Sequence, residues 1–282
     1  MVINCKKIAN ELEIKSKMET ENLRSLGIIP KLSIISVGDD EASKIYINSK
    51  TKACERAGIC TEEIALNKNT SEKELINIID GLNKDRSITG ILVQLPLPDH
   101  IDENKVAKAI DPQKDVDGLN PINMGNLISK NNVLIPCTAC AIIKVLEHEK
   151  IEISGKNCVV VGRSKIVGKP TAALMLNHDA TVTICHSKTE NLKSFCQNAD
   201  ILISATGKPS IVTSGMVKPG AVVIDVGINR SDDGRICGDV DFEGVSPIAS
   251  YITPVPGGIG PITVAMLVQN TILSAKLNSK IK

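Results

Sequence analysis

The chain of 282 residues is short of aromatic side chains, with no Trp, two Tyr and two Phe. Its core must therefore be aliphatic, since 42% of the sequence is still hydrophobic. The chain also has almost no net charge, because its 33 Lys and Arg nearly balance its 32 Asp and Glu. Without an excess of positive charge, we expect neither nucleic acid nor an anionic membrane as a partner.

Long apolar runs are also missing. No stretch approaches the roughly 18 apolar residues of a membrane span, and residues 1–23 contain no apolar core of signal-peptide length. Nine scattered cysteines are typical of reduced thiols, so we expect a soluble, cytoplasmic protein. Cys137 and Cys140 form a C-x-x-C pair, but no second pair at zinc-ligand spacing exists, and we expect no metal.

Strand-like and helix-like segments alternate along most of the chain. The alternation pauses at a Pro-, Asp- and Gly-rich passage, residues 111–126, and then resumes. The length suits two domains. The pattern predicts an α/β fold with two α/β domains flanking a cleft and mainly parallel sheets. The last helical segment, residues 263–277, could cover the second sheet or return to the first domain, and the sequence leaves both possibilities open.

The segment VVVGRSKIVGKP, residues 159–170, indicates a nucleotide-binding turn. A strand that runs through a glycine-flanked turn into a helix is the first unit of a dinucleotide-binding fold, where free backbone N–H groups at the helix N-terminus receive a pyrophosphate. Gly162 permits the tight turn, Gly168 permits close approach, and Pro170 suits the first helical turn. An ordinary βα turn has the same pattern, so this stretch alone leaves both interpretations open.

The following strand-like segment, ATVTICHSKT, ends in His186, Ser187 and Lys188 and has no acid there. Folds specific for NAD usually place an Asp or Glu at this point for the ribose hydroxyls. Together with Arg163, this arrangement leaves hydrogen-bond donors for a 2′-phosphate, which favours NADP.

Four polar residues in the first half of the chain could have either a structural or a functional role. Tyr46 and Lys50 lie four apart on a predicted helix, a spacing more often found in a packing pair. Gln94 interrupts an apolar strand and needs a hydrogen-bond partner. Asp117 precedes Gly118, a common turn sequence. The residues alone do not assign these side chains a function.

Segments from both halves resemble the bifunctional methylenetetrahydrofolate dehydrogenase/methenyltetrahydrofolate cyclohydrolase family. They are VGDDEASKIYINSKTKACERAGI, GILVQLPLP, PQKDVDG, GRSKIVGKP, ATVTICHSKT, AVVIDVGINR and TPVPGGIGPIT, and together they cover nearly the whole chain in order. PCTAC departs from the family's Pro-Cys-Thr-Pro and lacks the usual proline and glycine. We expect this departure to alter local loop geometry and not the chemistry.

The resemblance implies a folate-binding catalytic domain of residues 1–120 and 262–282, and a Rossmann-like NADP-binding domain of residues 121–261. It implies NADP-dependent oxidation of 5,10-methylenetetrahydrofolate to the methenyl form, hydrolysis of that product to 10-formyltetrahydrofolate, and a homodimer. By the same match, the Tyr46 ring packs along the folate, Lys50 takes part in catalysis with Gln94 as its partner, and Asp117 holds the N–H groups of the pterin.

The resemblance also extends to further binding residues. Those for the folate are Leu95, Pro256, Gly257 and Gly258, and those for the cofactor are Gly162, Arg163, Ser164, Gly168, His186, Ser187, Thr206, Gly207 and Ile228. Two alternatives are another two-domain NADP oxidoreductase, resembling shikimate dehydrogenase, and a nucleotide-binding regulator without catalysis. The first does not explain why Tyr46, Gln94 and the PGGIGP loop occur together. The presence of Tyr46, Lys50, Gln94 and Asp117 together argues against the second.

Overall fold

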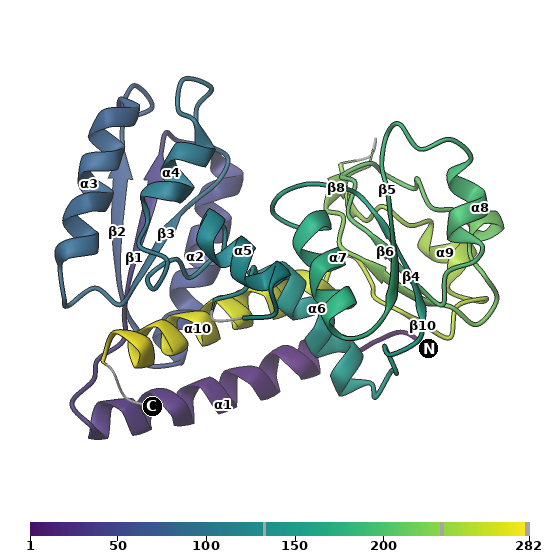
Figure 1. Ribbon diagram of the computed structural model, residues 1–282, viewed down its shortest axis with the longest axis horizontal. Helices are drawn as coiled ribbons and strands as arrows, with labels where there is room; N and C mark the ends of the chain where they lie inside the picture. Colours follow the sequence, from purple (N-terminus) through teal and green to yellow (C-terminus); the bar gives the residue numbers. More distant parts are fainter. Residues whose placement is uncertain (132–133, 232–233, 280–282) are drawn as a thin grey trace. The chain divides into compact units, whose positions relative to one another are not determined.

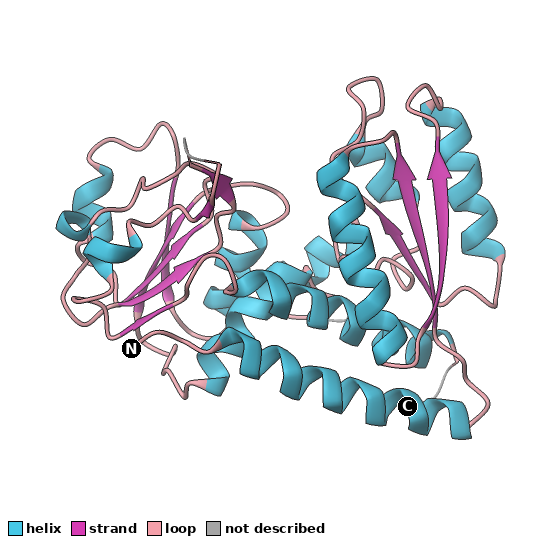
Figure 2. Cartoon of the chain, turned by 180° about the vertical axis from the view of Figure 1, so that it is seen from behind, coloured by secondary structure: helices cyan, strands magenta, loops and turns pink. Residues whose placement is uncertain are grey.

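The computed structural model describes residues 1–131, 134–231 and 234–279, which form two compact units (Figure 1). The three-stranded unit comprises Asn10–Cys137 and Val264–Lys282, and the five-stranded unit comprises Met1–Ala9 and Thr138–Thr263. In each unit the strands lie between helices (Figure 2). This arrangement confirms the predicted α/β class. Among the described residues, no helix combines the length and apolarity needed to cross a membrane.

The sheet of the three-stranded unit has the order β2-β1-β3 and is parallel throughout. Its strands and first helices are β1 (Lys31–Val37), α2 (Glu41–Arg56), β2 (Cys60–Leu66), α3 (Glu72–Lys84) and β3 (Gly90–Val93). Strand β1 leads through α2 to β2 on one side, and β2 leads through α3 to β3 on the other side of β1. The pair β1 and β3 is therefore a topological switch point, where ligands bind outside the carboxyl ends of the strands.

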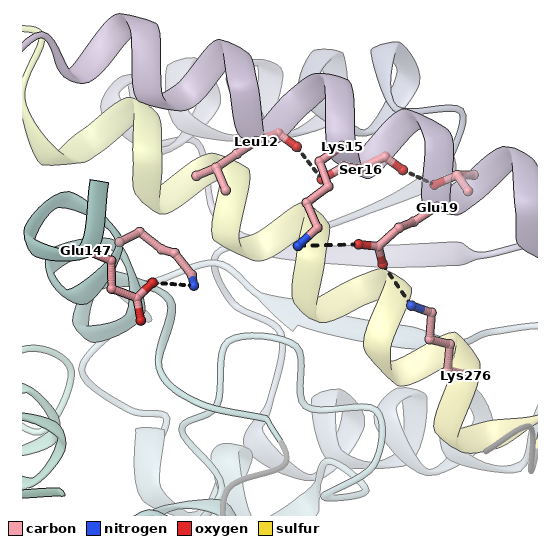
Figure 3. Close-up of polar contacts among 8 residues, drawn as sticks. Leu12, Lys15, Ser16, Glu19, Glu147 and Lys276 are labelled. Carbon is pink, nitrogen blue, oxygen red and sulfur yellow. Dashed lines mark hydrogen bonds and ion pairs between the residues drawn. The ribbon is translucent and has the colours of Figure 1, made fainter. Parts of the chain in front are cut away.

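Four more helices lie wholly or largely in this unit: α1 (Cys5–Ser25), α4 (Glu103–Ala109), α5 (Pro121–Ile128) and α10 (Ile259–Asn278). Helices α1 and α10 lie side by side, and Glu19 of α1 contacts Lys276 of α10 at 2.8 Å and Lys15 at 4.0 Å (Figure 3). From Val264 onward, α10 belongs to the three-stranded unit, so the chain returns there after its excursion through the other unit. The largest fully buried side chains of the protein are Leu and Ile, as the lack of aromatics requires.

One face of α10 carries polar residues every four positions, and these hold a loop beside β3. Asn270 Nδ2 donates to Val116 O at 2.8 Å and to Ile135 O at 2.9 Å, and Ser274 Oγ donates to Gln113 O at 2.5 Å. The loop also pairs with the sheet, since Ile91 N–H donates to Lys114 O at 2.7 Å. The segment before Asp117 is thus fixed from two sides.

The sheet of the five-stranded unit is also wholly parallel, in the order β10-β7-β6-β4-β5. Its strands are β4 (Asn157–Val161), β5 (Thr181–Cys185), β6 (Ile201–Ser204), β7 (Val222–Asp225) and β10 (Tyr251–Ile252). Its helices are α6 (Cys137–His148), α7 (Gly168–Asn177), α8 (Leu192–Cys196), the 3₁₀ helix η1 (Ser214–Met216) and α9 (Phe242–Val245), with a small antiparallel pair, β8 (Asn229–Arg230) and β9 (Ile236–Cys237). This doubly wound order confirms the Rossmann-like prediction and puts a second switch point between β4 and β6.

The division into units differs from the predicted boundary at residue 120. Residues 121–137 group with the three-stranded unit. The reason is local hydrogen bonding: Asn120 Nδ2 donates to Ile110 O at 2.8 Å, and Asn123 Nδ2 donates to Pro112 O at 2.9 Å. These two asparagines attach α5 to the loop that precedes it.

Residues 1–9 differ as well, because they group with the five-stranded unit and not with the residues that follow them. Val2 forms a parallel bridge with Ile252, and Ile3 N–H donates to Ile252 O at 2.9 Å. The first residues thereby extend the five-stranded sheet at its β10 edge.

We predict that Asn270→Ala destabilises the protein by about 2 to 4 kcal/mol, because the carbonyl groups of Val116 and Ile135 each lose the amide N–H that Asn270 donates. Urea denaturation of the full chain measures this change. The matched control is Asn278→Ala on the same face of α10, whose contacts to Thr89 O and Gln113 O are long, at 3.4 and 3.5 Å. It should cost under about 1 kcal/mol. Equal losses for the two variants would contradict the assigned role of Asn270.

Candidate active site

A lysine and a glutamine meet at the switch point of the three-stranded sheet. Gln94 directly follows β3, and its N–H donates to Ile35 O of β1 at 2.8 Å. Lys50 lies on α2, the helix that follows β1, and its Nζ donates to Gln94 Oε1 at 2.9 Å. Gln94 Nε2 donates to Leu95 O at 2.6 Å, so both polar atoms of this buried amide are satisfied. The bond to Leu95 also fixes which end of the amide faces Lys50.

The amine of Lys50 thus has a neutral acceptor as its partner. In the described part of the chain, no Asp or Glu forms an ion pair with Lys50. An amine held by an amide oxygen can give up or take a proton without breaking a salt bridge. The site therefore offers an amine in a fixed position whose charge no carboxylate has neutralised.

Tyr46 lies one turn before Lys50 on α2, on the same face of the helix. It is 41% exposed and is one of only four aromatic residues in the chain. An exposed aromatic ring beside a polar pair can stack on a flat ligand.

Asp117 lies in the loop beside β3, half-buried, and its carboxylate accepts no hydrogen bond from the residues that the structure describes. Its neighbour Gly118 has φ 71°, and a Cβ there would lie 2.5 Å from Pro136 N. Only glycine fits this turn. The parallel bridge between Ile91 and Asp115 directs the loop toward the edge of the sheet where Gln94 lies. The backbone of Asp117 is fixed while its carboxylate is left for the N–H groups of a ligand.

Asp115, the first acid of the KDVDG segment, was not among the residues predicted from the sequence. Its carboxylate is buried and accepts from Asn120 N–H at 2.7 Å and from Asn123 Nδ2 at 2.9 Å. Burial raises the pKa of Asp115 to about 6, and the nearby charge of Asp117 acts in the same direction. The buried carboxylate of Asp115 therefore stabilises the loop through hydrogen bonds, whereas the carboxylate of Asp117 accepts none from the described residues.

In the five-stranded unit, two predicted glycines allow backbone segments to approach closely at the second switch point. Gly162 follows β4 with φ 132°, and a Cβ there would lie 2.2 Å from Ala205 O, which follows β6. A Cβ on Gly168 would lie 2.2 Å from Gly162 O. The turn after β4, the start of α7 and the end of β6 therefore meet at one point.

The start of α7 differs from the expected free helix N-terminus. Ser164 Oγ accepts from Val167 N–H at 3.1 Å and from Gly168 N–H at 3.3 Å, and Ser164 O accepts from Lys169 N–H at 3.0 Å. Pro170 has no N–H to offer. Since the turn has already used these donors, an anion here would meet the exposed side chains of Arg163 and Ser164.

The remaining predicted cofactor residues follow other strands of the five-stranded sheet. His186 and Ser187 follow β5, Thr206 and Gly207 follow β6, and Ile228 follows β7. In a parallel sheet these positions share the carboxyl edge with Gly162. Pro256, Gly257 and Gly258 follow β10 and precede α10 within this same unit.

Nine cysteines are free thiols. Cys137 Sγ lies 3.3 Å from Val116 O. Over the described ranges, no cluster of three or more His, Cys, Asp or Glu side chains could hold a metal ion. The absence of a metal stays a prediction, which elemental analysis of the purified protein would test.

Comparisons with known proteins match both units. The model "Tetrahydrofolate dehydrogenase/cyclohydrolase, catalytic domain" matches residues 3–117, and the NAD(P)-binding domain of the same family matches residues 136–279. The chain is 52% identical to the "Bifunctional protein FolD" of Acetivibrio thermocellus, over 100% of this chain and 99% of that protein.

Two solved structures bear on the cofactor. A methylenetetrahydrofolate dehydrogenase-cyclohydrolase from Trypanosoma brucei, complexed with NADP and an inhibitor, is 38% identical, with a TM-score of 0.94 and coverage of 99% of this chain and 98% of that one. The NAD-dependent 5,10-methylenetetrahydrofolate dehydrogenase of Saccharomyces cerevisiae is 25% identical, with a TM-score of 0.82 and coverage of 100% and 98%.

The buried carboxyl of Asp115 predicts a pH-dependent stability. Its pKa of about 6 lies above the ordinary 3.8, so the folded protein holds this proton more tightly than the unfolded chain. The resulting stabilisation is complete below pH 4 and is lost as the pH rises through about 6. We predict that the free energy of unfolding of the wild type, minus that of Asp115→Asn, is up to about 3 kcal/mol greater at pH 4 than at pH 8. A difference that is constant across this range in urea titrations would count against the assignment.

Proposed function

Because the chain belongs to the tetrahydrofolate dehydrogenase/cyclohydrolase family, it is a bifunctional enzyme of one-carbon folate metabolism, and we propose that Lys50 and Gln94 carry its chemistry. The observation that supports this assignment is the 2.9 Å hydrogen bond between Lys50 Nζ and Gln94 Oε1 at the carboxyl end of β3. The two activities are oxidation of 5,10-methylenetetrahydrofolate and hydrolysis of the 5,10-methenyl product to 10-formyltetrahydrofolate.

We propose that Tyr46, Leu95 and Asp117 bind the folate, together with Pro256, Gly257 and Gly258. The exposed ring of Tyr46 provides a surface for stacking, and the carboxylate of Asp117 can accept from the amino and ring N–H groups of the pterin. This arrangement would place the one-carbon bridge of the folate beside Lys50, one turn along α2 from Tyr46.

In the oxidation step, the protein mainly binds and orients the reactants. NADP⁺, when bound, takes the hydride from the one-carbon bridge of the folate. The folate gains positive charge in this step, which a fully protonated lysine beside it would oppose. We propose that Lys50 is neutral or shares its proton there, and that Gln94 holds its amine in place without adding a charge.

In the hydrolysis step, Lys50 has a chemical role. Water that attacks the methenyl carbon must lose a proton, and the ring nitrogen that leaves must gain one. A positioned amine can accept the first proton and return one to the ring nitrogen as the C–N bond breaks. The hydroxyl of the adduct loses its proton as the carbonyl forms, so the cationic methenyl group and water give a neutral formyl group and one proton released to solvent. Gln94 is the positioning residue that keeps this amine directed at the reacting carbon.

The domain of residues 136–279 is of an NAD(P)-binding type, and we propose that its preferred cofactor is NADP. The exposed side chains of Arg163, Ser164 and Ser187, and the lack of an acid after β5, support this preference. The Trypanosoma brucei relative was solved with NADP, whereas the yeast relative is NAD-dependent, so the family contains both preferences. A homodimer and a cytoplasmic location also stay predictions.

Lys50→Met should separate the two activities. Methionine keeps much of the length and apolar packing of the lysine stem but removes the amine, so the variant should still bind folate and NADP⁺. We expect cyclohydrolase activity to fall roughly 10²- to 10⁴-fold while a measurable dehydrogenase remains and releases the methenyl product. NADPH and methenyl absorbance are followed in parallel.

The control for this experiment is Lys52→Met, an exposed lysine of the same helix. It should leave both activities unchanged. Hydrolysis by Lys50→Met at the wild-type rate would show that Lys50 is not the acid/base group. Loss of both activities with intact folate binding would contradict the division of labour.

Arg163→Ala should discriminate between the two cofactors. Losing a charged contact to the 2′-phosphate costs on the order of 1.5 to 3 kcal/mol, so NADP⁺ binding should weaken about 10- to 150-fold while NAD⁺ binding changes little. Calorimetric titration of both cofactors measures this, with Lys193→Ala on α8 as a control of equal charge change. Equal losses for NADP⁺ and NAD⁺ would show that Arg163 does not read the phosphate.

A further inference from the structure

Two buried acids lie behind the loops at the carboxyl edge of the five-stranded sheet. Asp225 is the last residue of β7, and Asp239 follows β9. Their exposed fractions are 3% and 0%. In the described part of the chain, neither forms an ion pair with a lysine or arginine, so hydrogen bonds from neutral groups alone compensate their charges.

Asp239 accepts four hydrogen bonds, two on each oxygen. Oδ1 accepts from Asn229 Nδ2 at 2.9 Å and from Lys208 N–H at 3.1 Å. Oδ2 accepts from Thr206 N–H at 2.6 Å and from Ser204 Oγ at 3.1 Å. One carboxylate therefore holds both the turn that follows β6 and the strand β8, which begins directly after Ile228.

Asp225 in turn holds Asp239. Its Oδ1 accepts from Asp239 N–H and Gly227 N–H, each at 3.0 Å, and its Oδ2 accepts from Val240 N–H at 2.9 Å. The two acids form a chain of support: Asp225 fixes the backbone at 239–240, and the side chain of Asp239 fixes the two loops in front of it.

Two glycines make room for these carboxylates. A Cβ on Gly227 would lie 2.0 Å from Asp239 Oδ1, and a Cβ on Gly238 would lie 1.9 Å from Asp225 Oδ2. The carboxylate of Asp239 thus sits directly against Gly227, whose N–H Asp225 binds, and the carboxylate of Asp225 sits directly against Gly238, the residue before Asp239. Such close approach leaves the loops little freedom to shift independently.

These loops lie at the switch point between β4 and β6. Thr206 and Gly207 follow Ala205, the residue whose carbonyl oxygen closely approaches Gly162. A ligand bound at the carboxyl ends of β4 and β6 must therefore lie against the turn that Asp239 holds. We propose that Asp239 is a positioning residue for the nicotinamide cofactor, acting through the 206–208 turn and the 228–229 segment, with Asp225 holding Asp239 in place. This inference rests on the proposed cofactor site.

A carboxylate suits this position because all four partners donate. An asparagine at 239 would keep one accepting oxygen and turn an NH₂ group toward two donors. In either orientation the 206–208 turn loses one of its two bonds, from Lys208 N–H on Oδ1 or from Thr206 N–H on Oδ2. Asp239→Asn should therefore displace a loop while it preserves the volume of the side chain. The three-stranded unit, where hydrolysis is proposed to occur, contains none of these contacts.

Calorimetry on the full chain tests the proposal by measuring the Kd for NADP⁺. A second readout is the hydrolysis of added methenyltetrahydrofolate, which consumes no NADP⁺. For Asp239→Asn, we expect the Kd to rise at least tenfold and hydrolysis to stay within twofold of the wild-type rate. The matched control is Asp241→Asn, two residues further on, which caps α9 by accepting from Gly244 N–H at 3.2 Å. Its Kd should stay within twofold of the wild type.

An unchanged Kd in folded Asp239→Asn would overturn the proposal, as would an equal loss of binding and hydrolysis. If that variant does not fold, Asn229→Ala removes one of the four donors and should still raise the Kd about threefold; no change there would overturn the proposal as well. A wild-type protein that binds neither NADP⁺ nor NAD⁺ would overturn the cofactor assignment itself. That result is distinguishable, because it appears before any variant is compared.

Discussion

Parallel pairing is the constraint on which both sites depend. Because β1 and β3 run in the same direction, as do β4 and β6, the residues that follow these strands emerge at one edge of their sheet. The helices that return the chain diverge to opposite sides at these pairs, which leaves the edge accessible. Gln94 follows β3 and Gly162 follows β4, so each comes directly after one strand of the switch point in its unit. In the three-stranded unit this position carries Gln94, whose amide holds the amine of Lys50. In the five-stranded unit it carries the turn after β4, where we propose that the nucleotide binds.

Buried charged groups hold loops in both units where regular secondary structure ends. Lys114 Nζ donates to Leu82 O, Asn83 O and Asp85 O at 2.9, 2.8 and 2.7 Å, so the ammonium caps the carboxyl end of α3. Burial lowers the pKa of Lys114, and burial raises the pKa of Asp225 to about 6. In both cases the cost of desolvation is met by backbone groups, which are thereby fixed in place. A loop that must present a ligand-binding side chain gains rigidity in this way.

The alternation of strands and helices could be predicted because apolar periodicity is a local signal. Gln94 could also be recognised, as a polar residue that interrupts an apolar strand, whereas the role of Lys50 and its partnership with Gln94 were predicted only from the family resemblance. Contacts between distant segments were not: Ile3 pairs with Ile252, and Asn270 supports Val116, with nothing in the sequence near either residue to indicate its partner. The occupied N–H groups of α7 were missed for a related reason, since the motif shows a serine at 164 but not that its hydroxyl turns back onto the helix.

The interlocked loops of the five-stranded unit limit how this protein can be changed by recombination or design. A side chain introduced at Gly227 collides with the carboxylate of Asp239, and one at Gly238 collides with that of Asp225. Substitutions at these positions would have to be made in pairs to be tolerated. Exchanging one loop with a relative of different cofactor preference would separate a carboxylate from its donors. Segments 204–208, 225–229 and 238–240 therefore constitute a single module, which can be transplanted only as a whole.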